Sequence, residues 1–192
     1  IVVDKSGVSG VRTDAGSTIL VEAVVITAGT FLDGKIHVGE KSYSAGRFGE
    51  PPSKGLTRSL IGLGFKTERL KTGTPPRLLG KSINWSALSL ASGDEDVNYF
   101  SIMTNEKKKP PNTPCYLAHT NKNTHNILSD NLAKSPMYSG KINATGPRYC
   151  PSVEDKIVRF SGRESHQLFL EPEWSGSKQI YINGFSTSMP EQ

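Results

Sequence analysis

The sequence of 192 residues contains only two cysteines, Cys115 and Cys150, which lie far apart along the chain. Two distant cysteines are too few for a disulfide scaffold, and they favour a reducing compartment. The cysteines and the four histidines show no closely spaced pairs, so the sequence predicts no metal site. It also lacks a visible signal peptide and any apolar run near the ~20 residues that a membrane-spanning helix needs. We therefore expect a cytoplasmic protein, or a mitochondrial one if the source is eukaryotic, with no membrane partner.

Neither end of the sequence carries a terminal signal. The chain starts at Ile1, inside a predicted strand and without an initiator methionine, and it stops at Gln192 without a terminal helix. We expect it to be a piece of a longer protein. Its length is still sufficient for one or two domains with a hydrophobic core.

The balance of charge is basic. A formal net charge of +5 favours anionic partners such as nucleotides or RNA, although a basic surface without a specific partner explains it equally well. The densest basic run, Lys107 to Lys109, is followed by two prolines, Pro110 and Pro111. That pattern is more typical of a solvated loop than of a binding site.

The first segment alternates glycine-bearing turns with β-branched runs. Residues 1–22 predict an antiparallel hairpin or a small meander, and residues 23–27 predict a buried strand. The predicted strand ends in Ala28-Gly29-Thr30, whose small side chains would let a ligand approach the carboxyl edge of an open α/β sheet. A tight turn without a ligand is the alternative.

A helix is predicted after the glycine-rich and proline-rich stretch "GRFGEPPS". Ser53 can cap this helix, Leu56, Leu60, Ile61 and Leu63 fall on one side, and Gly64 can end it. A helix start that follows a glycine-rich loop can bind an anion, although many ordinary helices begin in the same way.

The remaining chain predicts an irregular region followed by a return to a sheet. Residues 78–114 are polar and weakly periodic, and they predict an irregular region with one or two short strands, of which "VNYFSIM" is the best. A short helix is expected at 120–132, with Ile127, Leu128 and Leu132 on its inner side. The stretches "SHQLFLEPE" and "KQIYINGFSTS" predict two strands joined by a loop at 174–177.

Cys150 lies just before another predicted helix start. Ser152 fits the N-cap and Asp155 fits the third helical position, and Val153, Ile157, Val158 and Phe160 would form the buried face. The helix dipole and Arg148 favour a thiolate at Cys150, whereas Glu154 and Asp155 oppose it. A small buried hydrophobic cysteine is the alternative. His125 and His166 are candidate general bases, but their spacing does not place them near Cys150.

Several long motifs then resemble one family. "TAGTFLDGKIHVG", "GRFGEPPS", "RLKTGTPPR", "SPMYSG" and "GPRYCPSVEDKIVRF" followed by "HQLFLEPE" resemble the GidA/MnmG family of FAD-dependent tRNA-modifying proteins. The resemblance runs from Val24 to Pro190 and is weakest over 82–114.

The resemblance implies an α/β fold: part of a Rossmann-like FAD-binding domain with an irregular α+β inserted domain. Residues 1–76 would belong to the FAD-binding domain, 77–145 to the inserted domain, and 146–192 to the return of the chain with a nucleotide-binding segment. The implied activity adds a carboxymethylaminomethyl or aminomethyl group at C5 of the tRNA wobble uridine. It would use FAD, NADH and methylene-tetrahydrofolate, with the GTPase MnmE as partner and a homodimer as the oligomer.

The resemblance also assigns residues to roles. Ala28, Gly29, Thr30 and Ser53 would bind FAD, and Cys150 would be the catalytic cysteine, acting as a nucleophile or a proton donor. Arg69, Lys71 and Arg77 would form a surface for the tRNA backbone. The nicotinamide nucleotide would be bound by Gly146, Pro147, Arg148, Tyr149, Cys150, Pro151, Ser152, Val153, Glu154, Asp155, Lys156, Ile157, Val158, Arg159 and Phe160.

The sequence departs from the family pattern in two respects. It contains neither the Gly-x-Gly-x-x-Gly fingerprint of a dinucleotide-binding unit nor the helical C-terminal domain. We expect this chain alone to be inactive and to hold FAD poorly. Two alternatives are a folate- and FAD-dependent tRNA uridine methyltransferase, and a non-catalytic fragment that binds tRNA or docks a partner.

Overall fold

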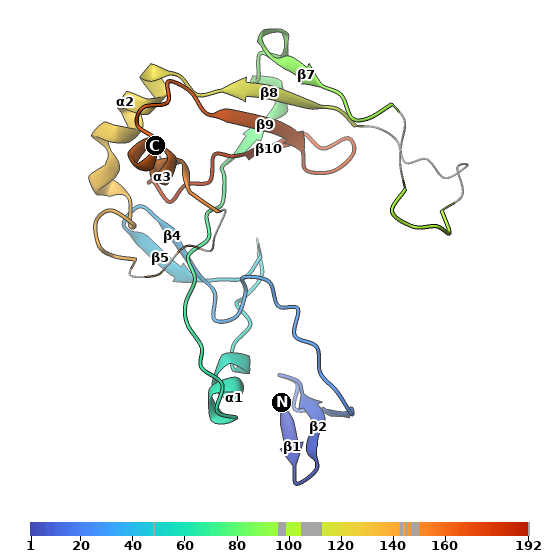
Figure 1. Ribbon diagram of the computed structural model, residues 1–192. Helices are drawn as coiled ribbons and strands as arrows, with labels where there is room; N and C mark the ends of the chain where they lie inside the picture. The colour runs from blue at the N-terminus through green and yellow to red at the C-terminus, as the bar shows by residue number, and fades with distance from the viewer. Residues whose placement is uncertain are drawn as a thin grey trace.

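The computed structural model describes residues 1–47, 49–95, 99–104, 113–142, 144, 146 and 150–191. Its strands form three sheets of three, two and five strands. The three-stranded sheet and helix α1 (Leu56–Gly62) lie at one end of the molecule (Figure 1). The five-stranded sheet lies at the other end, beside helices α2 (Lys122–Asp130) and α3 (Val153–Arg159) (Figure 1). The expected mixed α/β fold is confirmed, whereas its Rossmann-like character stays a prediction.

The N-terminal sheet is the predicted small meander. Strands β1 (Val2–Asp4), β2 (Gly7–Arg12) and β3 (Thr18–Leu20) pair in antiparallel fashion in the order β1-β2-β3. Gly7 begins β2 with a φ of 125°, a conformation that side-chain-bearing residues rarely adopt. The glycine in the turn therefore helps to determine the β1–β2 hairpin from its local sequence.

The predicted buried strand at 23–27 is wrong. This segment pairs with no other strand of the described chain, and Val25 and Ile26 are 85% and 40% exposed. A buried strand needs hydrogen-bonding neighbours and cover on both faces. Without them, a β-branched run remains extended and exposed.

A two-stranded hairpin connects the two ends of the molecule. Strand β4 (Lys35–Val38) pairs with β5 (Lys41–Ser44), and Gly39 forms the turn with a φ of 53°. The Gly39 amide donates to the Ser188 carbonyl at 2.8 Å. A Cβ at Gly39 would lie 2.6 Å from Pro190 Cβ, so the close contact with the C-terminal segment requires glycine.

Helix α1 forms where the sequence predicts it, but Ser53 does not cap it. The N-cap is Gly55, with a φ of 92° and no side-chain hydrogen bond. The backbone of Ser53 instead forms a parallel bridge with Leu32. Gly64 ends the helix as predicted, since its amide donates to the Ile61 carbonyl at 2.9 Å. No residue of α1 is buried, because none of the described elements covers its apolar side.

The five-stranded antiparallel sheet carries the larger core. In β9 (Gln167–Pro172) and β10 (Gln179–Asn183), every second residue is buried: Leu168 and Leu170, then Ile180 and Ile182. The predicted hairpin of these two strands is confirmed. The order of the sheet is β6-β10-β9-β8-β7, with β6 (Arg77–Leu79), β7 (Ser89–Ala91) and β8 (Cys115–His119). Two short 3-10 helices, Gly80–Ser82 and Trp85–Ala87, connect β6 to β7.

The irregular region was predicted less well. Residues 99–103 of "VNYFSIM" form no strand, and Phe100, Ile102 and Met103 are at least 89% exposed, while Val97 and Asn98 lie outside the described residues. One or two short strands were predicted within 78–114, and β7 lies there at other residues than "VNYFSIM", whereas β8 was not predicted. The sheet takes strands from both sides of the expected boundary at residue 145, and the three-part domain division stays a prediction.

A second, smaller core joins α2 and α3. Leu128, Val153 and Ile157 are buried together. Asn121 caps α2 by accepting from the Thr124 amide at 2.9 Å, and a short 3-10 helix follows at Leu132–Lys134.

Three residues that were predicted to face a core do not. Ile127 is 52% exposed, Val158 44% and Phe160 48%, because each short helix buries only one narrow face. Within the described residues, no helix is long and apolar enough to cross a membrane.

Candidate functional site

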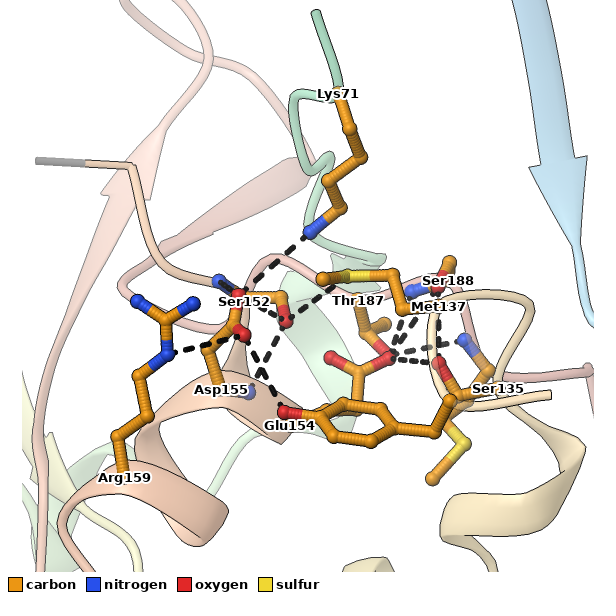
Figure 2. Close-up of polar contacts among 11 residues, drawn as sticks. Lys71, Ser135, Met137, Ser152, Glu154, Asp155, Arg159, Thr187 and Ser188 are labelled. Atoms are coloured by element: carbon orange, nitrogen blue, oxygen red, sulfur yellow. Dashed lines mark hydrogen bonds and ion pairs between the residues drawn. The ribbon is translucent and has the colours of Figure 1, made fainter. Parts of the chain in front are cut away.

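The start of α3 is the predicted capping box, and it lies in the interior. Ser152 Oγ accepts from the Asp155 amide at 3.2 Å, and the Ser152 amide donates to Asp155 Oδ2 at 3.1 Å (Figure 2). The Val153 amide donates to the Ser186 carbonyl at 2.7 Å. Ser152 and Val153 are fully buried. The backbone immediately after Cys150 is therefore fixed by local and long-range hydrogen bonds.

Glu154 connects α3 to two distant segments. Its side chain is fully buried, and Oε1 accepts from Thr187 Oγ1 at 2.9 Å, from the Ser188 amide at 3.1 Å and from Ser135 Oγ at 3.3 Å (Figure 2). Oε2 has no hydrogen-bond partner among the described residues. A buried carboxylate held by several neutral donors fixes the position of its helix.

Asp155 faces the opposite side of this network, toward Lys71. Lys71 Nζ lies 3.9 Å from Asp155 Oδ2, and both side chains are almost completely buried (Figure 2). Arg159 Nε lies 3.7 Å from Asp155 Oδ1. Since Lys71 is only 7% exposed, the prediction that it forms an RNA-facing surface is wrong. Arg69 and Arg77 were predicted to belong to the same surface. Arg69 donates to the Asp33 carbonyl, and Arg77 Nε lies 2.7 Å from Glu173 Oε1.

Tyr138 completes the contacts of Asp155. Its hydroxyl donates to Asp155 Oδ1 at 3.3 Å, and burial together with the negative charge of Asp155 raises the pKa of Tyr138 to about 12. The folded state therefore holds this proton more tightly than the unfolded state, whose tyrosines ionise near pH 10. We expect the stability contribution of Tyr138 to be complete below about pH 10 and to be lost between about pH 10 and 12. Between about pH 10 and 12, the midpoint temperature of thermal unfolding should fall less steeply with pH for Tyr138→Phe than for the parent. Identical pH dependences of the two midpoints would contradict the assignment.

Cys150 is half-buried and lies two residues before the helix cap. A Cβ at Gly146 would lie 3.7 Å from the Lys71 carbonyl oxygen, so Gly146, four residues before Cys150, lies beside the segment that contains Lys71. Pro147, Arg148 and Tyr149 lie outside the described residues, so the influence of Arg148 on the thiol stays a prediction.

The two candidate bases lie beside each other. The ring centroids of His125 and His166 are 5.4 Å apart, and Thr120 Oγ1 lies 2.8 Å from His125 Nε2. No described hydrogen bond or ion pair connects either histidine to Cys150. Their role as bases for this cysteine stays a prediction.

Backbone hydrogen bonds bring the predicted FAD residues together. The Phe31 amide donates to the Ala28 carbonyl at 3.3 Å, and the Ser53 amide donates to the Phe31 carbonyl at 3.0 Å. Ser53 thus lies beside the turn of Ala28, Gly29 and Thr30, although these segments are distant in sequence. No hydrogen bond among the described residues connects this turn to α3.

Sequence reasoning missed the partners that hold the start of α3. Ser135, Thr187 and Ser188 contact Glu154, and the prediction gave them no role. The motifs "RLKTGTPPR" and "SPMYSG" were used only for the resemblance. The structure places Lys71 from the first and Ser135 from the second around α3 (Figure 2). Tyr138, also from the second motif, donates to Asp155. Small polar residues in compact motifs were the available signal.

Comparison with known proteins assigns the whole chain to one family. The family model described as glucose inhibited division protein A matches residues 1–192. The structure of Aquifex aeolicus GidA in its form I crystal is similar, with 45% identity, a TM-score of 0.84, and coverage of 100% of this chain and 33% of that chain. The form II crystal gives 42% identity, a TM-score of 0.82, and coverage of 100% and 31%. The chain thus spans about a third of the length of these relatives. This chain belongs to the glucose inhibited division protein A (GidA) family.

Proposed function

We propose that the full-length protein is a flavoenzyme that modifies the wobble uridine of tRNA, adding an aminomethyl or carboxymethylaminomethyl group at C5. FAD and NADH would supply its redox chemistry and methylene-tetrahydrofolate its carbon unit. The GTPase MnmE would be its partner, and the protein would act as a homodimer. Membership of the GidA family supports the general assignment to tRNA modification.

One structural observation carries the proposal: the buried polar network that positions the loop of Cys150. Ser152, Glu154 and Asp155 are each at most 6% exposed and hydrogen-bonded, while Cys150 just before them keeps partial exposure. A reactive side chain needs a backbone that does not move during the reaction. Burying these three polar residues at the start of one short helix would be costly without hydrogen bonds, and the bonds that each of them makes also fix the position of the helix start.

The turn at 28–30 would be the FAD contact in this proposal. Gly29 adopts a φ of 57°, and Gly29 and Thr30 are exposed. A Cβ at Gly29 would lie 3.4 Å from the Phe31 ring, so the turn presents its backbone beside an aromatic side chain. Ala28, Gly29, Thr30 and Ser53 are the residues that would hold FAD. The segment 146–160 would hold NADH, and because Ser152, Val153 and Glu154 are fully buried, its contacts would come from the accessible residues of the segment, such as Lys156 and Arg159.

Cys150 has two possible roles in this reaction. As a nucleophile, its thiolate would add to C6 of the uracil ring, forming a carbon–sulfur bond and moving the C5–C6 π electrons toward C5. C5 would then attack the one-carbon unit, and loss of the C5 proton would expel the thiolate again. As a proton donor, the thiol would instead give a proton to the uridine or the flavin.

The proposal is tested with the full-length protein and tRNA that lacks the modification. We expect the purified protein to show flavin absorbance and, with its co-substrates and MnmE, to modify C5 of the wobble uridine, as detected by nucleoside mass spectrometry. A methylated uridine elsewhere in the tRNA would favour the methyltransferase alternative. A colourless protein that binds tRNA and leaves every uridine unchanged would overturn the proposal.

A further inference from the structure

A cavity lies where the end of β8 and the start of β9 meet α3. The cavity has a volume of about 440 Å³. Its wall includes His119 from β8, Lys156 from α3, and Arg163 and His166 from the connection to β9. Pairing of His119 with Gln167 and the hydrogen bond from the Thr120 amide to the His166 carbonyl, 2.9 Å, hold these segments together.

The lining of this cavity is basic. None of its lining residues, all of which the structure describes, is acidic. Lys156 and Arg163 form no ion pair with any described residue. Glu154 and Asp155, beside Lys156 in sequence, face Ser135 and Lys71 instead, and Glu164 does not line the cavity. Positive charge is therefore concentrated in a concave site without an internal counter-ion.

His166 is the buried member of this cavity lining. It is only 6% exposed, and its Nε2 atom has no hydrogen-bond partner among the described residues. Burial, together with the positive charges of His125, Lys156 and Arg163, lowers the pKa of His166. The lowered pKa favours the neutral imidazole, which still leaves one buried ring nitrogen without the hydrogen bond that a ligand would supply.

We propose that this cavity binds a phosphate ester. Arg163, Lys156, two histidines and Ser165 line one space, and their side chains form a donor set suited to phosphate oxygens. Lys156 Nζ is held in place by donating to the Gly184 carbonyl at 2.7 Å. The Phe160 ring lies 5.6 Å from Arg163 Cζ and offers an apolar surface beside the charges.

The phosphate could belong to a nucleotide or to an RNA backbone, which share this chemistry. The inference deepens the proposed function. It rests on that function only in the choice of a nucleotide and an RNA backbone as the two sources of the phosphate. It adds His119, Arg163 and His166 to the residues of segment 146–160 that would bind phosphate. The evidence for it is the lining of the cavity.

The experiment measures binding by calorimetry to the full-length protein, with three probes: inorganic pyrophosphate, adenosine diphosphate and an unmodified anticodon stem-loop RNA. Arg163→Gln and His166→Gln are compared with Arg12→Gln, which removes an exposed arginine outside the cavity. We expect each cavity variant to weaken pyrophosphate binding roughly tenfold, the effect of losing one charge-assisted hydrogen bond. Arg12→Gln should bind as the parent does. The midpoint temperature of thermal unfolding shows whether each variant is folded. If His166→Gln is unstable, the binding measured with Arg163→Gln decides the result, because Arg163 is exposed.

The other two probes identify the source of the phosphate. Weaker binding of adenosine diphosphate alone would indicate a nucleotide, and weaker binding of the RNA alone would indicate the RNA backbone. If Arg163→Gln binds all three probes as tightly as Arg12→Gln does, the inference is wrong. Modification of tRNA is assayed on the same preparations, so that a failure of this inference is distinguished from a failure of the proposed function.

Discussion

Replacing Cys150 with serine in the full-length protein is expected to abolish modification of the wobble uridine while leaving the flavin content near normal. At neutral pH a serine hydroxyl is a much weaker nucleophile and acid than a cysteine thiol, so we expect a loss of roughly 10³-fold or more. The flavin should remain because no described hydrogen bond connects the turn at 28–30 with Cys150. Nucleoside mass spectrometry and flavin absorbance measure the two effects separately.

Cys115→Ser is the matched control. Cys115 lies in β8, where burial and the negative charge of Glu171 raise the pKa of its thiol, so that it stays protonated at neutral pH. We expect this variant to keep its activity. Normal modification by Cys150→Ser would refute the catalytic role of Cys150, and an inactive but folded Cys115→Ser would show that the second cysteine is also needed.

Glu154→Ala is expected to produce the largest loss of stability. The change leaves Thr187 Oγ1 and the Ser188 amide without their acceptor and creates a cavity at a fully buried position. Loss of a buried acceptor together with its packing costs about 2–4 kcal/mol. Because Glu154 positions the helix that follows Cys150, modification activity should fall as well. The midpoint of urea unfolding of the full-length protein measures the effect.

Two further variants isolate the cause. Glu154→Gln keeps the volume and one acceptor oxygen, so we expect it to cost no more than about 1 kcal/mol. Glu164→Ala removes an exposed acid near the other end of the same helix and should leave the unfolding midpoint unchanged. Equal midpoints for Glu154→Ala and Glu164→Ala would rule out a structural role for the network.

The sequence predicted best the features that depend on near neighbours. The capping box of Ser152 and Asp155 forms because both residues lie within one helical turn. The hairpin of β9 and β10 follows from alternating apolar residues on either side of a short loop. The end of α1 at Gly64 follows from the ability of glycine to adopt a positive φ.

Predictions of burial failed where they depended on distant partners. Local propensity gave an extended conformation at 23–27, but no described strand pairs with it, so Val25 and Ile26 remain exposed. Ser53 had the right side chain for a cap, yet its backbone pairs with Leu32 before the helix begins. Val158 follows the apolar pattern of α3, but only the opposite face of that short helix packs against α2.

By itself, the sequence determined the helix start after Cys150, the two final strands and, through its motifs, membership of the GidA family. Only the tertiary structure decided that Lys71 is buried against Asp155, and that Ser135, Thr187 and Ser188 hold Glu154. Capping and strand alternation are set by covalent neighbours within a few residues. The burial of a charge is set by whichever distant segments pack around it, and no local pattern contains that information.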